Sequence, residues 1–266
     1  MTDAPPLIPD QRRDLILGHL RRDAVLSYRQ LAALVGVSHM TVRRDIAELE
    51  RQGKVVATQG GAKIVARVAA EPPRTEKAGA DVVQKDAMAR HAATMVRESM
   101  TIYLDAGTTL QAMRPHLQSF QDLTVVTNDL VIAGSYLDHP TIDIITLGGR
   151  VEKRNRSTVG RIPALTLREL SLDIAFLTTS SWDLRRGVTI PAESKVEPKQ
   201  AAVRAAETSV LVAASSKYGT FGRYRILGLG ELDLVITDDG LPETEAAAIE
   251  AEWSVTVERV AATGRR

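Results

Sequence analysis

The sequence predicts an α/β protein in two parts. A large domain is built on a mostly parallel sheet, and a small N-terminal unit contains helices and a hairpin. The large domain is predicted by short apolar runs that alternate with helical stretches after residue 100, a pattern typical of a parallel sheet covered by helices. The small unit is predicted by two capped helices and a Gly-Gly turn within residues 27–63.

Two helices joined by a tight turn form the centre of the small unit. Ser27 can cap the first helix while Gln30 reaches back to its backbone. Gly36 permits the left-handed conformation that ends a helix, and Ser38 can cap the second one. An earlier helix at about residues 11–21 completes the core. Apolar spacing predicts these inward-facing residues: Leu15, Ile16 and Leu20, then Leu31, Leu34 and Val35, then Val42, Ile46 and Leu49.

The second helix of the pair carries side chains suited to reading DNA. Arg can pair bidentately with guanine, and Thr or Met can contact the thymine methyl group. A hairpin is expected next, with strands at Val55-Val56 and Ile64-Val65 around Gly60-Gly61. This order predicts a winged helix-turn-helix that binds double-stranded operator DNA. The expected DNA-contacting residues are Ser38, His39, Met40, Thr41, Arg43 and Arg44 on the helix and Lys54 and Lys63 beside the hairpin.

The distribution of charge agrees with DNA binding. Residues 1–67 hold 11 Lys and Arg against 7 Asp and Glu, whereas the remaining residues hold 23 against 26. The basic excess therefore lies on the small unit, as contact with phosphates requires. Because the excess is small, tight binding is expected to need two copies per operator, which predicts a homodimer or homotetramer.

Composition excludes several other classes of protein. The chain has no Cys, so a disulfide framework, a thiolate nucleophile and a Cys-ligated metal are excluded, and a cytoplasmic location is favoured. No apolar run has the length of a membrane span. Aromatic residues make up 4% of the chain, which argues against a stacking surface for single strands. The five His residues lack a ligand-like spacing, and we expect neither a metal nor a cofactor.

Three segments are expected along the chain. They are the winged unit over residues 1–66, a linker over residues 67–81 that contains Pro72-Pro73, and the α/β domain over residues 82–266. A helix is expected within residues 82–100. The expected strands are residues 101–104, 123–126, 142–147, 173–179, 209–214 and 232–237, and the run WSVTVERV can add an edge strand. The other expected helices are residues 110–117, 129–137, 162–170, 196–207 and 243–250.

Polar residues at the ends of these strands are the candidates for a ligand site, since ligands of parallel sheets bind at the carboxyl ends of the strands. Gly107 lets the backbone turn after the first strand, and Thr108 and Thr109 offer hydroxyls at a helix start, which suits an anion. Lys217 can add positive charge, and Asp105 can accept hydrogen bonds from sugar hydroxyls. A small phosphorylated sugar or polyol is therefore predicted. On this turn alone, a simple helix cap is an equal alternative.

These motifs, taken in order, resemble the DeoR family of bacterial transcriptional regulators. The resemblance runs from about residue 12 to residue 238. It rests on VSHMTVRRDIAELERQGKV with the following Gly-Gly, and then on LDAGTT, VTNDL, Gly148-Gly149, Gly160, Gly187, SSKYG and VITD. It implies a sensor fold similar to ribose-5-phosphate isomerase and coenzyme A transferases. It also implies a repressor of a carbohydrate-utilisation operon that a phosphorylated sugar relieves.

The resemblance also implies roles for single residues. It implies phosphate binding by Gly107, Thr108 and Thr109, and DNA contact by Ser38, Met40, Thr41, Arg43 and Arg44. The other ligand-contacting positions that it implies are Asp105, Thr127, Asn128, Gly149 and Lys217. The chain departs from the family at three places. Thr58 and Gln59 replace an Arg and a His before the wing glycines, Ala214 replaces an Asp before the sensor Lys, and a Gly near Ser181 is replaced in SSW.

Two alternatives to repression remain open from the sequence. An activator of the same kind of operon would carry the same motifs. An isomerase of phosphosugars with an added DNA module would need a positioned acid/base pair. Asp105 and Lys217 are candidates for that pair, but Ala214 removes a carboxylate near the lysine, so no catalytic residue is expected.

Overall fold

The computed structural model describes residues 7–262 and divides into two compact units. The first unit runs to Arg67 and includes Gly219–Phe221, and the second holds Val68–Tyr218 and the chain from Gly222 onward. Residues 68–81, expected to be a linker, thus belong to the second unit. Among the described residues, no helix combines the length and the apolar character needed to cross a membrane.

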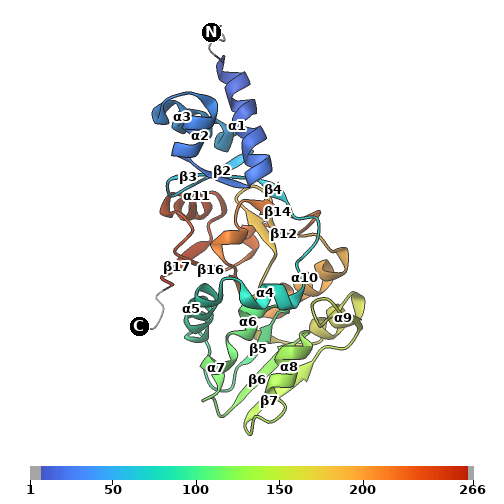
Figure 1. Cartoon of the computed structure of the whole chain (residues 1–266). Helices are drawn as coiled ribbons and strands as arrows, with labels where there is room; N and C mark the ends of the chain where they lie inside the picture. The colour runs from blue at the N-terminus through green and yellow to red at the C-terminus, as the bar shows by residue number, and fades with distance from the viewer. Residues whose placement is uncertain (1–6, 263–266) are drawn as a thin grey trace. The chain divides into compact units, whose positions relative to one another are not determined.

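The first unit has three helices and a small antiparallel sheet (Figure 1). The sheet has the strand order β1-β3-β2. The short strand β14 (Thr220–Phe221) pairs with β4 (Ala66–Arg67). The other elements are α1 (Pro9–Asp23), β1 (Val25–Ser27), α2 (Tyr28–Val35), α3 (His39–Arg51), β2 (Val55–Thr58) and β3 (Gly61–Ile64).

The caps expected for the two central helices are confirmed. The Ser27 hydroxyl accepts from the Gln30 amide at 3.2 Å, and the Gln30 side chain accepts from the Ser27 amide at 2.9 Å. Gly36 ends α2 with a φ of 68°. The Ser38 hydroxyl accepts from the Thr41 amide at 3.2 Å and so starts α3. These local bonds fix the turn between the helices.

The predicted core of the first unit is correct except at two positions. Leu34 and Leu15 are 46% and 44% exposed, so the expectation that they face inward is wrong. Ala32 and Leu17, which follow the buried residues Leu31 and Ile16 in the chain, are buried instead. On both helices Leu34 and Leu15 lie at the edge of the apolar face and point to solvent.

The wing has one strand more than the sequence predicted. β1 pairs with β3 on the side opposite β2, so the expected hairpin is part of a three-stranded sheet. A Cβ on Gly61 would lie 2.3 Å from the carbonyl oxygen of Leu26. Only glycine permits this close approach of the two strands. A strand of three residues between two helices has too short a pattern to predict from sequence.

The second unit is built on a seven-stranded sheet with the order β17-β16-β13-β10-β5-β6-β7. All six pairings are parallel. Every expected strand is present, with boundaries shifted by a few residues, and the final run forms an edge strand. The strands are β5 (Thr101–Leu104), β6 (Leu123–Thr127), β7 (Ile142–Thr146), β10 (Leu172–Leu177), β13 (Ala206–Val212), β16 (Leu234–Asp238) and β17 (Thr256–Val260).

Helices bury both faces of this sheet. Ile102 and Leu104 alternate with Tyr103 along β5, and all three are fully buried although neighbours on a strand face opposite ways. Figure 1 shows α9 beside α10 and apart from α5, in agreement with the contacts between α9 and α10. The helices are α4 (Arg74–Gly79), α5 (Val82–Ala93), α6 (Thr108–Gln111), α7 (Arg114–Leu117), α8 (Leu130–Tyr136), α9 (Arg161–Arg168), α10 (Val196–Ala205) and α11 (Glu243–Trp253).

Two differences from the expected elements affect the site. The helix expected over residues 110–117 is split into α6 and α7, with Pro115 at the start of α7. The charged run after Gly149, for which no strand was expected, forms a hairpin of β8 (Arg150–Glu152) and β9 (Ser157–Val159). A further small sheet, β11 (Ser181–Asp183), β12 (Gly187–Ile190) and β15 (Tyr224–Leu227), was not predicted. Three short 3-10 turns complete the unit: η1 (Glu193–Lys195), η2 (Ser215–Lys217) and η3 (Leu229–Glu231).

The strand order locates the crevice in which a ligand can bind. From β5 the chain builds the sheet outward through β6 and β7, and from β10 it builds in the opposite direction through β13, β16 and β17. The order therefore reverses between the neighbouring strands β5 and β10. In open parallel sheets this is the point where helices diverge to opposite faces and leave a crevice at the carboxyl ends. Asp105 and Thr178 follow directly on these two strands.

Candidate functional site

The outer face of α3 presents the residues expected to meet DNA. Ser38, His39, Arg43 and Arg44 are exposed, and Met40 is 61% exposed. The Arg43 guanidinium lies 5.0 Å from the centre of the Tyr28 ring, which supports its long side chain at the surface. Beside the wing, Lys54 is exposed and Lys63 is half-buried.

A buried ion pair holds α3 in place behind this face. Asp45, on the inner side of α3, accepts from Arg12 of α1 at 2.5 Å to Nε and 3.1 Å to Nη2. The two side chains are 6% and 13% exposed. A bidentate Arg–carboxylate pair fixes orientation as well as distance. It thus sets the angle at which α3 presents its outer face.

In the second unit, the turn after β5 is bonded to the turn after β6. The Asn128 side-chain oxygen accepts from the Ala106 amide at 3.1 Å and from the Tyr103 hydroxyl at 2.9 Å. The Asp129 carboxylate accepts from the Gly107 amide at 3.0 Å, and its other oxygen caps α8. These bonds hold residues 105–109 rigidly at the crevice.

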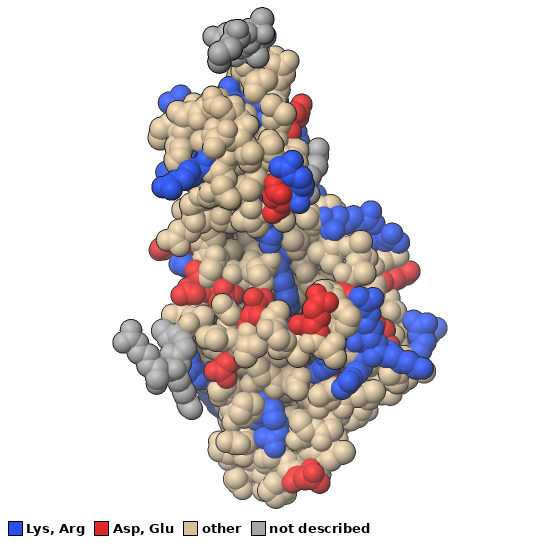
Figure 2. All heavy atoms as spheres, viewed as in Figure 1, with Lys and Arg blue, Asp and Glu red and all other residues tan. Residues whose placement is uncertain are grey.

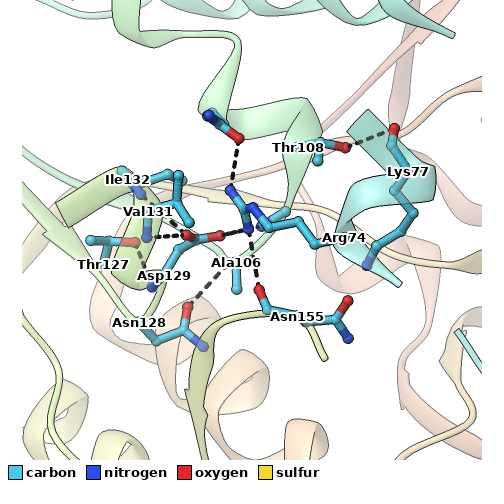
Figure 3. Close-up of polar contacts among 12 residues, drawn as sticks. Arg74, Lys77, Ala106, Thr108, Thr127, Asn128, Asp129, Val131, Ile132 and Asn155 are labelled. Carbon is cyan, nitrogen blue, oxygen red and sulfur yellow. Dashed lines mark hydrogen bonds and ion pairs between the residues drawn. The ribbon is translucent and has the colours of Figure 1, made fainter. Parts of the chain in front are cut away.

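Arg74 from α4 completes this network (Figure 3). Its guanidinium donates to Asp129 at 2.5 Å, to the Gln111 side chain at 2.8 Å and to the Asn155 carbonyl at 3.3 Å. The Arg74 and Asp129 side chains are 7% and 0% exposed. Thr108 lies close by, with its hydroxyl 3.5 Å from the Lys77 carbonyl oxygen. Residues 74–77, which the sequence placed in a linker, therefore form a wall of the site.

Asp105 faces the opposite wall of the crevice. Its carboxylate forms a buried ion pair with Lys199 of α10 and accepts from the Thr178 amide at 3.0 Å. Lys199 also donates to the Thr178 carbonyl at 2.7 Å. A Cβ on Gly107 would lie 2.8 Å from the Thr178 methyl group, so the glycine allows the two turns to touch. These contacts join the ends of β5 and β10 at the switch point.

Five lysines from different parts of the chain gather around this crevice. Each is bonded to a carboxylate or to backbone carbonyl oxygens. Lys195 lies 2.9 Å from Glu71 and 3.0 Å from Glu152. Lys217 donates to the Thr179 carbonyl at 2.7 Å. The group comprises Lys77, Lys85, Lys195, Lys199 and Lys217, which we call the lysine cluster.

The mutual influence of these charges is seen in their pKa values. Burial lowers the pKa of Lys217, and the positive charges of Lys85 and Lys77 lower it further, to about 8. Burial also lowers the pKa of Lys77, against the pull of Glu71. Burial raises the pKa of Glu71, but Lys195 and Lys77 outweigh this effect and bring it to about 2. Such perturbed groups in a cleft are typical of a binding site for a charged ligand.

The structure brings most of the expected ligand residues together but gives several of them internal partners. Thr109 is 2% exposed, and the Thr127 hydroxyl donates to the Leu104 carbonyl at 2.6 Å. The side-chain oxygens of Asn128 and Asp105 accept the hydrogen bonds described above. Gly149 has a φ of 132°, and a Cβ there would lie 2.9 Å from Pro163 Cδ. Thr108 and Lys217 are half-buried, so these two expected residues remain partly exposed to solvent.

Sequence reasoning missed the residues that surround these two. Lys77, Lys85, Lys195 and Lys199 carry no local motif, and a Lys on a predicted helix usually indicates a solvated face. Asp129 could have been found, since it follows Thr127-Asn128 at the end of a predicted strand. Arg74 and Glu71 lie next to Pro72-Pro73, which favoured a linker over a wall of the site.

Two of the family departures contact each other in the structure. Trp182 is fully buried, and its indole N–H donates to the Ala214 carbonyl at 3.4 Å. The ring packs edge-on against Tyr218, with centroids 4.8 Å apart. Lys217 lies between Ala214 and Tyr218 in the chain. Ala214 and the SSW segment near Ser181, the sites of two departures, therefore belong to one packed group next to a residue of the lysine cluster.

Other features of the second unit fit a phosphate less well. A groove of about 650 Å³ is lined by Glu193, Glu197, Arg223 and Arg225 among others, and its charges balance. Figure 2 shows basic side chains gathered over the part that Figure 1 labels α9. Lys153 and Arg154 in the β8–β9 hairpin and Arg161 at the start of α9 are exposed. In residues 7–262, no group of three or more His, Cys, Asp or Glu could hold a metal ion.

Comparison with known proteins identifies both units. The model of the DeoR-like helix-turn-helix domain matches residues 12–68, and that of the DeoR C-terminal sensor domain matches residues 80–239. The helix-turn-helix regulator YgbI of Escherichia coli K12 is 44% identical over 91% of this chain and 95% of its own length. The repressor GlcR of Bacillus subtilis is 30% identical over 86% and 88%.

Among solved structures, ribose 5-phosphate isomerase A of Methanocaldococcus jannaschii is 16% identical with a TM-score of 0.37, over 50% of this chain and 53% of that one. The sequence relatives and both family models span most of the chain. They agree with the winged unit and with the seven-stranded sheet described above. The chain belongs to the DeoR family and is a DNA-binding transcriptional regulator with a sensor domain.

Proposed function

We propose that this regulator represses a carbohydrate-catabolic operon in the cytoplasm and that a phosphorylated sugar, bound at the lysine cluster, relieves the repression. The observation that carries the proposal is the concentration of five lysines around the switch point of the sheet. A phosphate near pH 7 carries a charge of about −1.5 to −2 and three acceptor oxygens, which suit several ammonium donors at once.

Two buried hydroxyls that lack a hydrogen-bond partner within the described chain support a ligand with a polyol portion. Among the described residues, the hydroxyls of Thr178 and Ser180 are buried and have no hydrogen-bond partner. Buried hydroxyls are usually paired, so a partner from outside the chain fits these two. Thr178 contacts Gly107 and Lys199, so its hydroxyl would lie beside the lysines that we propose to bind phosphate.

Binding without turnover follows from the state of the buried pair. Asp105 and Lys199 are bonded to each other and to Thr178, so neither is held ready to move a substrate proton. We propose that the site senses its ligand and does not transform it. Release of DNA then requires that the ligand bind the DNA-free form more tightly than the DNA-bound form.

A ligand screen followed by an operator assay tests this function. The operator is first selected from random DNA. Thermal shifts are then measured with a panel of phosphorylated sugars and with the same sugars lacking phosphate, since a ligand of the native state raises its apparent stability. We expect stabilisation by a phosphorylated member alone, release of preformed operator complexes by that compound, and its recovery unchanged after incubation.

The matched variant is Thr108→Val/Thr109→Val, which removes both hydroxyls and keeps the β-branched shape. A loss of about 2–3 kcal/mol of binding free energy would raise the ligand concentration needed for release roughly two orders of magnitude. Stabilisation by the phosphate-free sugars to the same extent would contradict the phosphate site. Footprints upstream of the promoter would indicate activation in place of repression.

A further inference from the structure

Glu71 places a negative charge from the chain itself among the lysines of the cluster. One oxygen of its carboxylate lies 2.9 Å from Lys195 Nζ, 3.2 Å from Lys77 Nζ and 3.0 Å from the Asn155 side-chain nitrogen. The side chain is 12% exposed. A carboxylate held by two ammonium groups and an amide nitrogen has the same kind of partners that a bound phosphate would have.

Glu71 belongs to the segment that begins where the first unit ends. Arg67 is the last residue of the first unit before the chain enters the second, and residues 68–73, which we call the strap, follow it. The strap is fixed to the second unit through Glu71, whereas α4, which comes next, is held separately through Arg74 and through its backbone. The Lys77 carbonyl accepts from Lys85 at 2.5 Å, and the Arg74 amide donates to the Arg154 carbonyl at 3.2 Å.

We propose that Glu71 acts as an internal stand-in for the ligand's phosphate on Lys195 and Lys77, and that ligand binding displaces it and frees the strap. This inference rests on the proposed function, since the displaced contact lies in the proposed ligand site. A phosphate dianion competes well because it carries about twice the charge of a carboxylate and more acceptor oxygens.

The surroundings of Glu71 leave capacity for an incoming ligand. The Asn155 side-chain oxygen is buried and has no hydrogen-bond partner among the described residues, although the nitrogen of the same amide holds Glu71. Lys195 keeps Glu152 as a partner at 3.0 Å if Glu71 leaves. Phosphate takes the place of Glu71 on Lys77, so displacement exchanges one anion for another. A freed strap of 6 residues can extend to roughly 20 Å, which changes the tether of the DNA-binding unit.

Hydrogen exchange of the full-length wild-type protein tests the displacement directly. Exchange is measured in potassium phosphate and in potassium chloride at the same ionic strength, and phosphate binding is followed by calorimetry. We expect phosphate to accelerate exchange of the strap amides. Unchanged or slower exchange while phosphate binds overturns the proposal, because a strap that closes over its ligand becomes protected.

Three single substitutions separate displacement from a simple change in charge. Glu71→Gln should exchange rapidly in the strap without phosphate and bind phosphate several-fold more tightly. Glu76→Gln removes a charge of the same sign from an exposed residue of α4, just after the strap, and should match wild type. Glu152→Gln removes a carboxylate from Lys195 outside the strap. It should bind phosphate more tightly while the strap stays protected until phosphate is added.

The outcomes distinguish the two proposals. The displacement is overturned if strap exchange is equal in Glu71→Gln and Glu76→Gln, or if Glu71→Gln binds phosphate more weakly than wild type. In either case the proposed function still stands, provided that wild type binds phosphate. Absence of phosphate binding by wild type and all three variants counts against the proposed function and the displacement together.

Discussion

At the scale of single residues, the sensor site depends on how buried charges are compensated. Lys199 and Asp105 neutralise each other at the switch point, and Arg74 and Asp129 do so beside it. Lys217 donates to the Thr179 carbonyl and has a pKa lowered to about 8 by burial and by the positive charges of Lys85 and Lys77. The buried pairs therefore position the turns, and the protonation state of Lys217 can change near physiological pH.

The pH dependence of ligand binding should follow Lys217. Above pH 8 this lysine loses its charge, so affinity for a phosphorylated ligand should fall as pH rises through 8. The fall should be roughly tenfold or more, since a charge-assisted hydrogen bond contributes about 1.5–3 kcal/mol. The folded-state pKa lies below the unfolded value, so deprotonation has the opposite effect on the ligand-free protein, whose stability should rise between pH 8 and 10.5.

Calorimetric titrations at several pH values measure this dependence. Lys217→Arg keeps the charge above pH 8 and serves as the control, because its affinity should stay level where that of the wild type falls. The same decline in both proteins would place the titrating group elsewhere.

Removing one member of the buried ion pair at the switch point should destabilise the protein. Lys199→Met leaves the Asp105 carboxylate buried without its cation, and such a loss typically costs about 3–5 kcal/mol. Asp105→Asn/Lys199→Met removes both charges and should recover most of that stability. Both tryptophans, Trp182 and Trp253, lie in the second unit, so urea unfolding followed by their fluorescence reports on the sensor domain. If the double variant is no more stable than Lys199→Met, the two side chains do not stabilise each other in the folded protein.

At the scale of elements, α3 and the wing are the surface that we propose to read DNA, and α1 holds α3 through the Arg12–Asp45 pair. The helix pair, its caps and the hairpin were predicted from sequence because each depends on residues close together in the chain. The third strand β1 was not, because its three residues gain their structure from β3, far along the chain.

The recognition helix should lose specific DNA binding when its arginines are removed. Arg43→Ala/Arg44→Ala should weaken operator binding at least tenfold, since a bidentate base contact contributes about 1–3 kcal/mol. Arg22→Ala removes an exposed arginine of α1 and is the matched control. Gel shifts with operator and with unrelated DNA measure both. Operator binding by the double variant equal to that of Arg22→Ala would show that α3 is not the reading helix.

At the scale of the whole molecule, the parallel sheet was predictable and its site only partly so. Apolar runs marked every strand of the seven-stranded sheet, so the ends of β5 and β6 and the residues Asp105 and Thr108 could be found. The direction of each side chain was not predictable, which is why Asn128 and Thr127 turned out to be bonded within the protein. Lys199 is 94 residues away from Asp105 in the chain, and no local pattern connects them.

The regulator should bind its operator with at least two copies. The winged unit has a small excess of basic residues, and paired half-sites about 10 base pairs apart, or a multiple of that, are the usual geometry. Mass photometry of the protein–operator complex should show two or four chains, and a single half-site should bind weakly. Full affinity of one chain for one half-site would contradict this expectation.

The reversal of strand order between β5 and β10 also has a consequence for synthesis on the ribosome. β10 starts roughly 70 residues after β5 ends, so at about 5–20 residues per second it emerges several seconds later. During this interval β5, β6 and β7 can pair, but one side of β5 exposes unpaired backbone groups that can join another chain. Lys199 and Lys217 are made later still. The seam that we propose to hold the ligand in the finished protein is thus the open edge of the nascent one.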